Sequence, residues 1–165
     1  MRIHVRPAGG CFVRSLELRV PPDVVALVVV GVMWVLSRLG AVIPLEPFLR
    51  YLLGMAFVLA GLAVVFAARE AFARNNTSWG PLSPSHASTL VTDGIYSVSR
   101  NPMYLGTWLF LVGVGVMMGS YFSAIGSLLY NVYVDRFQIA PEERALATKF
   151  REDFEWYCHK VRRWV

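Results

Sequence analysis

Apolar residues are gathered into blocks along this chain, and polar residues fill the gaps between the blocks. The first block covers residues 24–45 and is interrupted only by Arg38. The second covers residues 51–68 and has no charged side chain. A third stretch runs from Asn101 to Val134, which is 34 residues without one acidic or basic group. Blocks of this length are typical of helices that cross a membrane.

The third stretch is too long for one membrane-spanning helix. At about 1.5 Å per residue it would extend about 51 Å, whereas the hydrocarbon layer of a bilayer is about 30 Å thick. We therefore expect a helical hairpin that turns near residues 118–121, with arms of about 103–118 and 121–138. Both arms are short, so we also expect tilt or local thinning of the bilayer.

The composition supports the membrane class. Hydrophobic residues make up 56% of the 165 residues and charged residues 16%, against about 25% charged residues in soluble proteins. The mean hydropathy is +0.49. We expect an all-α, polytopic membrane helical bundle with about four transmembrane helices and a C-terminal cytoplasmic helix, all in a single domain over residues 1–165.

The basic residues predict the orientation of the bundle. The first 23 residues carry four arginines, the segment 69–100 carries three, and the tail from residue 135 carries seven basic residues, which makes 4 + 3 + 7 = 14 of the 16 in the chain. Positive residues concentrate on the cytoplasmic side of membrane proteins. We expect both termini and any active site to be cytoplasmic, at the inner membrane if the source is bacterial. We attribute the net charge of +5 to basic residues that lie near the anionic headgroups of the bilayer. We therefore expect the bilayer as a partner and no nucleic acid.

These features divide the domain into four parts: two N-terminal spans over 1–70, a polar cytoplasmic loop over 71–102, the helical hairpin over 103–140, and a cytoplasmic tail helix over 141–165. In the tail, Pro141 suits the first position of a helix. Apolar residues then recur at spacings of 3 and 4, which predicts a stripe on one face of the helix. The stripe comprises Leu146, Phe150, Phe154, Tyr157 and Val161.

Two polar clusters stand at the two ends of the predicted hairpin. The first contains Tyr96, Arg100, Asn101 and Tyr104, with Pro102 at the start of the arm, and the second contains Asp135, Arg136, Gln138, Glu142 and Glu143. Because a hairpin brings its two ends to the same face, we expect the clusters to form a pocket at the cytoplasmic interface. Such groups also occur at helix ends simply to satisfy the helix dipole or to reach the headgroups. The three histidines are far apart in sequence, so we expect no metal site.

The clusters belong to two longer motifs. The first, G-x-Y-x-x-x-R-[HN]-P-x-Y-x-G, is matched from Gly94 to Gly106, and the second, E-E-x-x-L-x-x-x-F-x-x-x-[FY]-x-x-Y-x-x-x-V, is matched from Glu142 to Val161. Together they resemble the isoprenylcysteine carboxyl methyltransferase family and the wider group that includes the phospholipid methyltransferases. The resemblance covers about residues 88–164.

The resemblance implies an integral membrane methyltransferase that uses S-adenosylmethionine as its cofactor. The cofactor would lie between the loop before the hairpin and the start of the tail helix. The residues implied to bind it are Ser88, Thr89, Leu90, Val91, Tyr96, Asn101, Pro102, Met103, Tyr104 and Glu142. The residues implied to act in catalysis are Arg100, Asn101, Tyr104 and Glu142, and Gln138 occupies the position implied to contact the substrate.

Three positions depart from the carboxyl methyltransferases of that family. Those enzymes usually have His where this chain has Asn101, and an Arg for the substrate carboxylate where it has Gln138. Arg136 does not replace that Arg, because two residues along a helix correspond to a rotation of about 200°. Arg151 stands where Gly is common, although a regular helix needs no glycine there. The resemblance therefore predicts the cofactor and the reaction more firmly than the acceptor.

We expect methyl transfer to a lipophilic or small acceptor at the cytoplasmic membrane interface. The acceptor group could be a carboxylate, an amine or a thiol, and a prenylcysteine-type carboxyl methyltransferase in the strict sense is one of these alternatives. A second hypothesis is a non-catalytic membrane scaffold or subunit. A third is a membrane enzyme of the sterol reductase type with a nicotinamide cofactor, which the short chain disfavours.

Overall fold

A computed structural model describes residues 17–40, 42–75 and 89–165 of the chain. These residues form an all-helical fold, as the sequence predicts. The helices are α2 (Pro22–Ser37), α3 (Pro47–Arg74), the short 3₁₀ turn η2 (Gly94–Ser97), α4 (Pro102–Met117), α5 (Tyr121–Gly126), α6 (Leu128–Val134), the π-helical turn η3 (Asp135–Ile139) and α7 (Ala140–Lys160).

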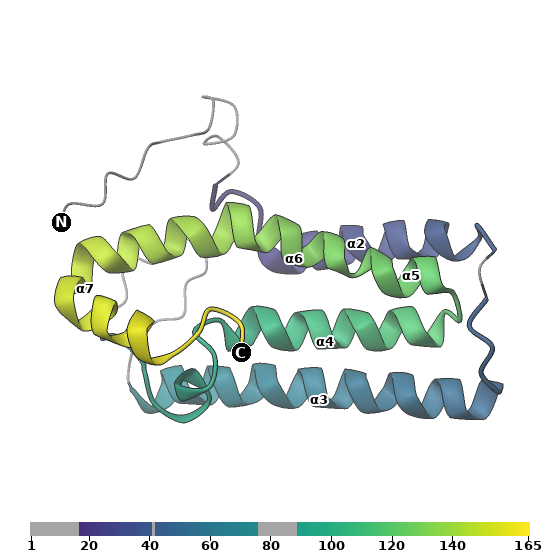
Figure 1. The fold of residues 1–165 in the computed structure, drawn as a ribbon, viewed down its shortest axis with the longest axis horizontal. Coiled ribbons are helices and arrows are strands. Elements are labelled where there is room, and N and C mark those ends of the chain that lie inside the picture. Colours follow the sequence, from purple (N-terminus) through teal and green to yellow (C-terminus); the bar gives the residue numbers. More distant parts are fainter. Residues whose placement is uncertain (1–16, 41, 76–88) are drawn as a thin grey trace.

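The four apolar segments lie side by side with α4 beside α3 and the α5–α6 segment beside α2 (Figure 1). Of the described helices, α3 alone is both long and apolar enough to cross a membrane, whereas α2 and α4 are apolar but shorter. Many large apolar side chains on these helices face outward, and Phe66 and Leu27 are 64% and 72% exposed. An apolar exterior of this kind is what a bundle in a lipid environment requires.

Helices α3 and α4 pack closely because glycines face one another along their seam. A Cβ atom added to Gly61 would lie 2.5 Å from the carbonyl oxygen of Gly106, and one added to Gly106 would lie 2.6 Å from the carbonyl oxygen of Gly61. Gly54 and Gly113 face each other in the same way one heptad further along. Small residues at such positions allow the backbones of membrane helices to approach closely. This seam fixes α4, whose first residues, Pro102 to Gly106, form the end of the first sequence motif.

The first apolar block ends earlier as a helix than the run 24–45 suggests. Helix α2 stops at Ser37, and Gly40 follows in the left-handed region with φ +101. The chain then extends toward the hairpin turn, where Ile43 N donates to Gly119 O at 2.9 Å and Val42 pairs with Ser120. Gly119 (φ +73) makes the turn between α4 and α5, within the range 118–121 where the sequence predicts it.

The second arm of the hairpin runs into the tail helix without a break, in contrast to the separate tail helix expected over 141–165. Pro141 has no N–H and its ring would crowd the carbonyl four residues earlier, and the turn η3 widens the helix at this point. That carbonyl belongs to Phe137, and it accepts a hydrogen bond from Leu18 N at 3.1 Å. Gln138 Nε2 donates to Val20 O at 2.6 Å. The N-terminal segment is thereby held against η3.

Helix α7 bends back at Arg151 and ends at Lys160, so residues 161–165 are not helical. Arg151 has φ 44 and ψ −112. A positive φ strains any residue with a Cβ, so the expectation that the helix needs no glycine at this position was wrong. The kink brings the second half of α7 back toward the start of α4, and the C-terminus lies beside that start (Figure 1). The predicted apolar stripe packs together around Phe154, Tyr157 and Val161, with Leu90 against it.

Candidate active site

A cavity of about 180 Å³ lies where the two sequence motifs meet. The loop before α4, the first turns of α4 and the first turn of α7 form one side of it. The inner faces of α2, α3 and α6 form the other side. The predicted residues that line it are Thr89, Leu90, Val91, Tyr96, Arg100, Asn101, Met103, Tyr104 and Glu142.

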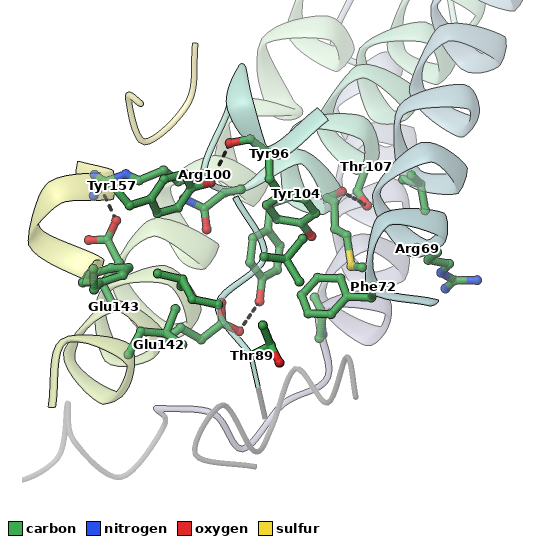
Figure 2. Close-up of a pocket in the computed structure, with 18 of the residues that line it drawn as sticks. Arg69, Phe72, Thr89, Tyr96, Arg100, Tyr104, Thr107, Glu142, Glu143 and Tyr157 are labelled. Carbon is green, nitrogen blue, oxygen red and sulfur yellow. Dashed lines mark hydrogen bonds and ion pairs between the residues drawn. The ribbon is translucent and has the colours of Figure 1, made fainter. Parts of the chain in front are cut away.

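Tyr104 and Glu142 connect the two motifs directly. The Tyr104 hydroxyl donates a hydrogen bond of 2.6 Å to Oε1 of Glu142, and Figure 2 shows the two side chains pointing toward one another across the cavity. Tyr104 stands in the first turn of α4, and Glu142 in the first turn of α7. The hairpin therefore brings together two residues that are 38 positions apart.

The environment of Glu142 weakens its acidity. Burial raises the pKa of this carboxyl from the ordinary value of 4.5 to about 7, the neighbouring charge of Glu143 adds to the rise, and the hydrogen bond from Tyr104 opposes it. A group that titrates near neutral pH inside a cavity is a feature of functional sites. A cation that entered the cavity would favour the ionised form of Glu142 and would be bound by it.

A second link between the motifs is an ion pair at the edge of the cavity. Arg100 Nη2 lies 3.1 Å from Glu143 Oε1, and the two side chains are only 14% and 17% exposed. Arg100 also contacts the Cys158 thiol, whose pKa is raised by burial. Arg100 is thus paired with groups of the second motif and of the tail helix.

The loop before α4 is held in place by aromatic side chains. Tyr96 is buried and meets Phe72 of α3 edge to face, with ring centroids 5.4 Å apart. Its backbone carbonyl accepts a hydrogen bond of 2.6 Å from the Tyr157 hydroxyl of α7. Burial raises the pKa of both phenols, so both remain neutral hydrogen-bond donors at physiological pH. These contacts fix the wall that includes Val91.

Two of the predicted site residues that the structure describes do not line the cavity. Pro102 is buried at the start of α4 but contributes no surface to the cavity. Gln138, expected at the substrate position, is fully buried and bound to the Val20 carbonyl, which takes its amide away from the cavity. Ser88 lies outside the described residues. We therefore assign no ligand contact to Gln138.

The far side of the cavity, which is formed by residues of α2, α3, α4 and α6, was not predicted from the sequence. Asp23 of α2 reaches the cavity, as do Thr107 of α4 and Tyr130 of α6. Arg69 of α3 lies at the opposite side from Glu142, and its guanidinium points away from the other labelled residues (Figure 2). Each is a polar group within or at the end of an apolar block, which is a signal for a functional position in a membrane protein.

Comparison with known proteins places these motifs in a family. Residues 49–153 match the family model described as phospholipid methyltransferase, which covers most of the chain from α3 to α7. The chain belongs to the phospholipid methyltransferase family. The description of the family model names methyl transfer as the reaction of the family. The matched range includes every described residue that the sequence predicts for the site.

Two relatives extend this finding. The protein-S-isoprenylcysteine O-methyltransferase of Schizosaccharomyces pombe is 35% identical over 75 residues, which is 44% of this chain and 30% of that protein. An uncharacterized protein of Haemophilus influenzae is 35% identical over 63 residues, which is 38% of this chain and 100% of that protein. The match thus spans less than a third of the fission yeast enzyme. No solved structure matches the chain.

Proposed function

We propose that this member of the phospholipid methyltransferase family transfers the methyl group of S-adenosylmethionine to a lipophilic or small acceptor at the membrane interface. The observation that carries the proposal is the cavity in which Tyr104 and Glu142 join the two motifs. The fission yeast relative is named for prenylcysteine O-methylation, and the family for phospholipids. Both names point to acceptors that reside in membranes.

The residues around the cavity suit this cofactor. S-adenosylmethionine supplies an electrophilic methyl group on a sulfonium centre, and it also carries an amino group, a carboxylate and an adenine ring. Glu142 is the carboxyl that would hold a cationic part of it. Leu90, Val91 and Met103 would provide apolar walls for the adenine, and backbone groups of the segment 89–91 would supply donors and acceptors.

Methyl transfer requires little acid–base chemistry from the protein. The step is an in-line displacement, so the protein must align the acceptor with the methyl group and keep water out. We assign alignment to Tyr104 and Asn101, which stand at the start of α4 and line the cavity. We assign the exclusion of water to the aromatic residues Tyr96, Phe154 and Tyr157, which lie on the cytoplasmic side in the proposed orientation.

We further propose that all four apolar segments lie in the bilayer, with both termini and the cavity on the cytoplasmic side. The segment α5–α6 and helices α2 and α4 are each shorter than α3, so the bilayer would thin around them. Fourteen of the 16 basic residues flank the cytoplasmic ends in this orientation. Labelling of cysteines introduced in turn at Gly40 and Glu155 with a membrane-impermeant reagent tests the orientation, because the two positions would lie on opposite sides.

The direct test of the cofactor is binding to the purified protein in detergent. A ligand present at about 100 times its dissociation constant stabilises the folded state by about 2.7 kcal/mol. We expect S-adenosylmethionine to raise the melting temperature of the wild-type protein and to raise it much less in Glu142→Ala and Tyr104→Ala. The matched control is Glu152→Ala, which removes an exposed carboxylate from the same helix.

Three outcomes distinguish the hypotheses. Loss of the shift in the two site variants alone supports the proposal. The absence of any shift with S-adenosylmethionine, together with tolerance of both substitutions, would favour a scaffold. A shift with a nicotinamide cofactor in place of S-adenosylmethionine would favour the reductase type.

A further inference from the structure

The last residues of the chain cross the start of α4 and bind it through their backbone. Helix α7 ends at Lys160, and Val161 is extended, with φ −121 and ψ 134. Beyond it, the carbonyl of Arg162 accepts a hydrogen bond of 3.1 Å from Arg100 N. The next carbonyl, of Arg163, accepts one of 3.0 Å from Asn101 Nδ2. We refer to residues 162–164 as the C-terminal clasp.

The C-terminal clasp determines which side-chain atom of Asn101 is available to a ligand in the cavity. An Asn that precedes a helix usually caps the helix with its side-chain oxygen, but Asn101 makes no such bond to α4. Its amide nitrogen faces the Arg163 carbonyl, which can only accept a hydrogen bond. The assignment of nitrogen and oxygen therefore follows from the partner. Since Asn101 is only 9% exposed and lines the cavity, its remaining polar atom, the oxygen Oδ1, is the one available to a ligand.

The Arg163 side chain anchors the clasp at two points. Its Nη2 lies 2.5 Å from Glu143 Oε2, and its Nη1 lies 3.1 Å from Asp135 Oδ1. Glu143 is also the partner of Arg100. The guanidinium thus ties η3 and α7 to the segment that leads into α4, and Trp164 packs against the apolar cluster that contains Tyr104. Lysine could not replace it fully, because a single ammonium lacks the fork of donors.

We propose that the C-terminal clasp is part of the cofactor site and that Arg163 is a positioning residue, which acts by holding Asn101 with its side-chain oxygen toward the cavity. Arg163 itself does not line the cavity, so it acts through Asn101 and not by touching a ligand. The clasp lies beyond residues 49–153, the range that matches the family model. This inference rests on the proposed use of S-adenosylmethionine.

The test measures the dissociation constant for S-adenosylmethionine in four proteins: wild type, Arg163→Ala, Asn101→Ala and the double variant. Measurements are made well below the melting temperature of every protein. We expect Arg163→Ala to weaken binding at least about fivefold, the size of a typical coupling between linked groups. In the Asn101→Ala background, Arg163→Ala should raise the dissociation constant by less than about twofold, because the side chain through which Arg163 acts has been removed.

The control is Lys160→Ala, which removes one positive charge from the same tail. The Lys160 side chain is exposed and lies over the Trp156 ring, away from the cavity. We expect its affinity to stay within about twofold of the wild type. Arg163→Lys supplies a second variant if Arg163→Ala fails to fold, and it should bind with intermediate affinity.

The failure of this inference differs from the failure of the proposed function. If the wild-type protein does not bind S-adenosylmethionine, the proposed function is overturned and the clasp has no cofactor to serve. If the wild type binds but Arg163→Ala binds equally well, the inference alone is overturned. It is also overturned if the effects of Arg163→Ala and Asn101→Ala on affinity are additive, since a purely structural role would act independently of Asn101.

Discussion

The titration of Glu142 gives the sharpest prediction about ligand binding. Its carboxyl is half-buried, bonded to Tyr104 and placed next to Glu143, and its pKa is raised to about 7. If a cationic ligand binds only when Glu142 is ionised, its apparent affinity scales with the ionised fraction. That fraction is about 0.09 at pH 6 and about 0.91 at pH 8 for a pKa of about 7. Affinity for S-adenosylmethionine should therefore rise about tenfold across this range.

Stability should change in the opposite direction. A carboxyl whose pKa is higher in the folded state than in the unfolded state favours folding when it is protonated, so its contribution is complete below pH of about 4.5 and is lost as pH rises through about 7. The difference between 4.5 and about 7 corresponds to about 3 kcal/mol at most. Replacement of Glu142 by Gln should therefore stabilise the ligand-free protein more at pH 8 than at pH 5.

Isothermal titration at pH 6, 7 and 8 measures the affinity, and melting temperatures at pH 5, 6, 7 and 8 measure the stability. The wild-type protein and Glu142→Gln are compared in both assays, which cancels the titration of the cofactor itself. The reasoning would be refuted if wild-type affinity were flat between pH 6 and pH 8. It would also be refuted if Glu142→Gln kept the same slope, because another group would then be responsible.

Three further predictions concern the site and the scaffold. Tyr104→Phe should weaken S-adenosylmethionine binding by about tenfold or more, since a hydrogen bond to a charged group contributes about 1.5–3 kcal/mol. Unchanged affinity would show that this hydrogen bond does not position the Glu142 carboxylate for the ligand. Gly61→Ala should lower the melting temperature, with a cost in stability of about 1–3 kcal/mol, because the new methyl group would lie 2.5 Å from the Gly106 oxygen. The control Gly31→Ala has open space around the new methyl group and should be nearly neutral. Equal effects of the two substitutions would contradict the close packing of α3 against α4. Arg151→Gly should raise the melting temperature by relieving a backbone strain of about 1–2 kcal/mol, while Arg151→Ala, which keeps the Cβ, should not. A higher melting temperature in both variants would mean that the positive φ at Arg151 is not the source of the strain.

The residues that meet across the hairpin could be predicted from the sequence because their proximity depends only on the topology of the chain. A hairpin returns its two ends to one face whatever the rotation of its arms, so Tyr104 and Glu142 had to be neighbours if residues 103–138 formed a hairpin. The motifs then indicated which of the polar residues at those ends face the cavity. The apolar spacing of the tail likewise predicted the packing of Phe154 and Tyr157.

The far side of the cavity could not be predicted, because the large apolar residues of α2, α3 and α4 show no helical periodicity. Residues 51–68 of α3 are apolar on all sides, so their hydrophobicity does not indicate which face turns toward Tyr96, and Phe72 was missed. The kink at Arg151 was missed because an arginine gives no sign of a positive φ. The C-terminal clasp was missed because it binds Arg100 and Asn101 through backbone carbonyls, which every residue possesses.

The central claim is that the cavity carries out methyl transfer from S-adenosylmethionine to an acceptor in the membrane. The most direct test incubates the purified protein with S-adenosylmethionine that carries an isotopically labelled methyl group, together with a membrane lipid extract, and identifies the labelled products by mass spectrometry. We predict label in a product that forms with the wild-type protein and with Glu152→Ala, and that is lost with Glu142→Ala. The claim would be contradicted if no labelled product formed with the wild type, or if Glu142→Ala formed it at the same rate.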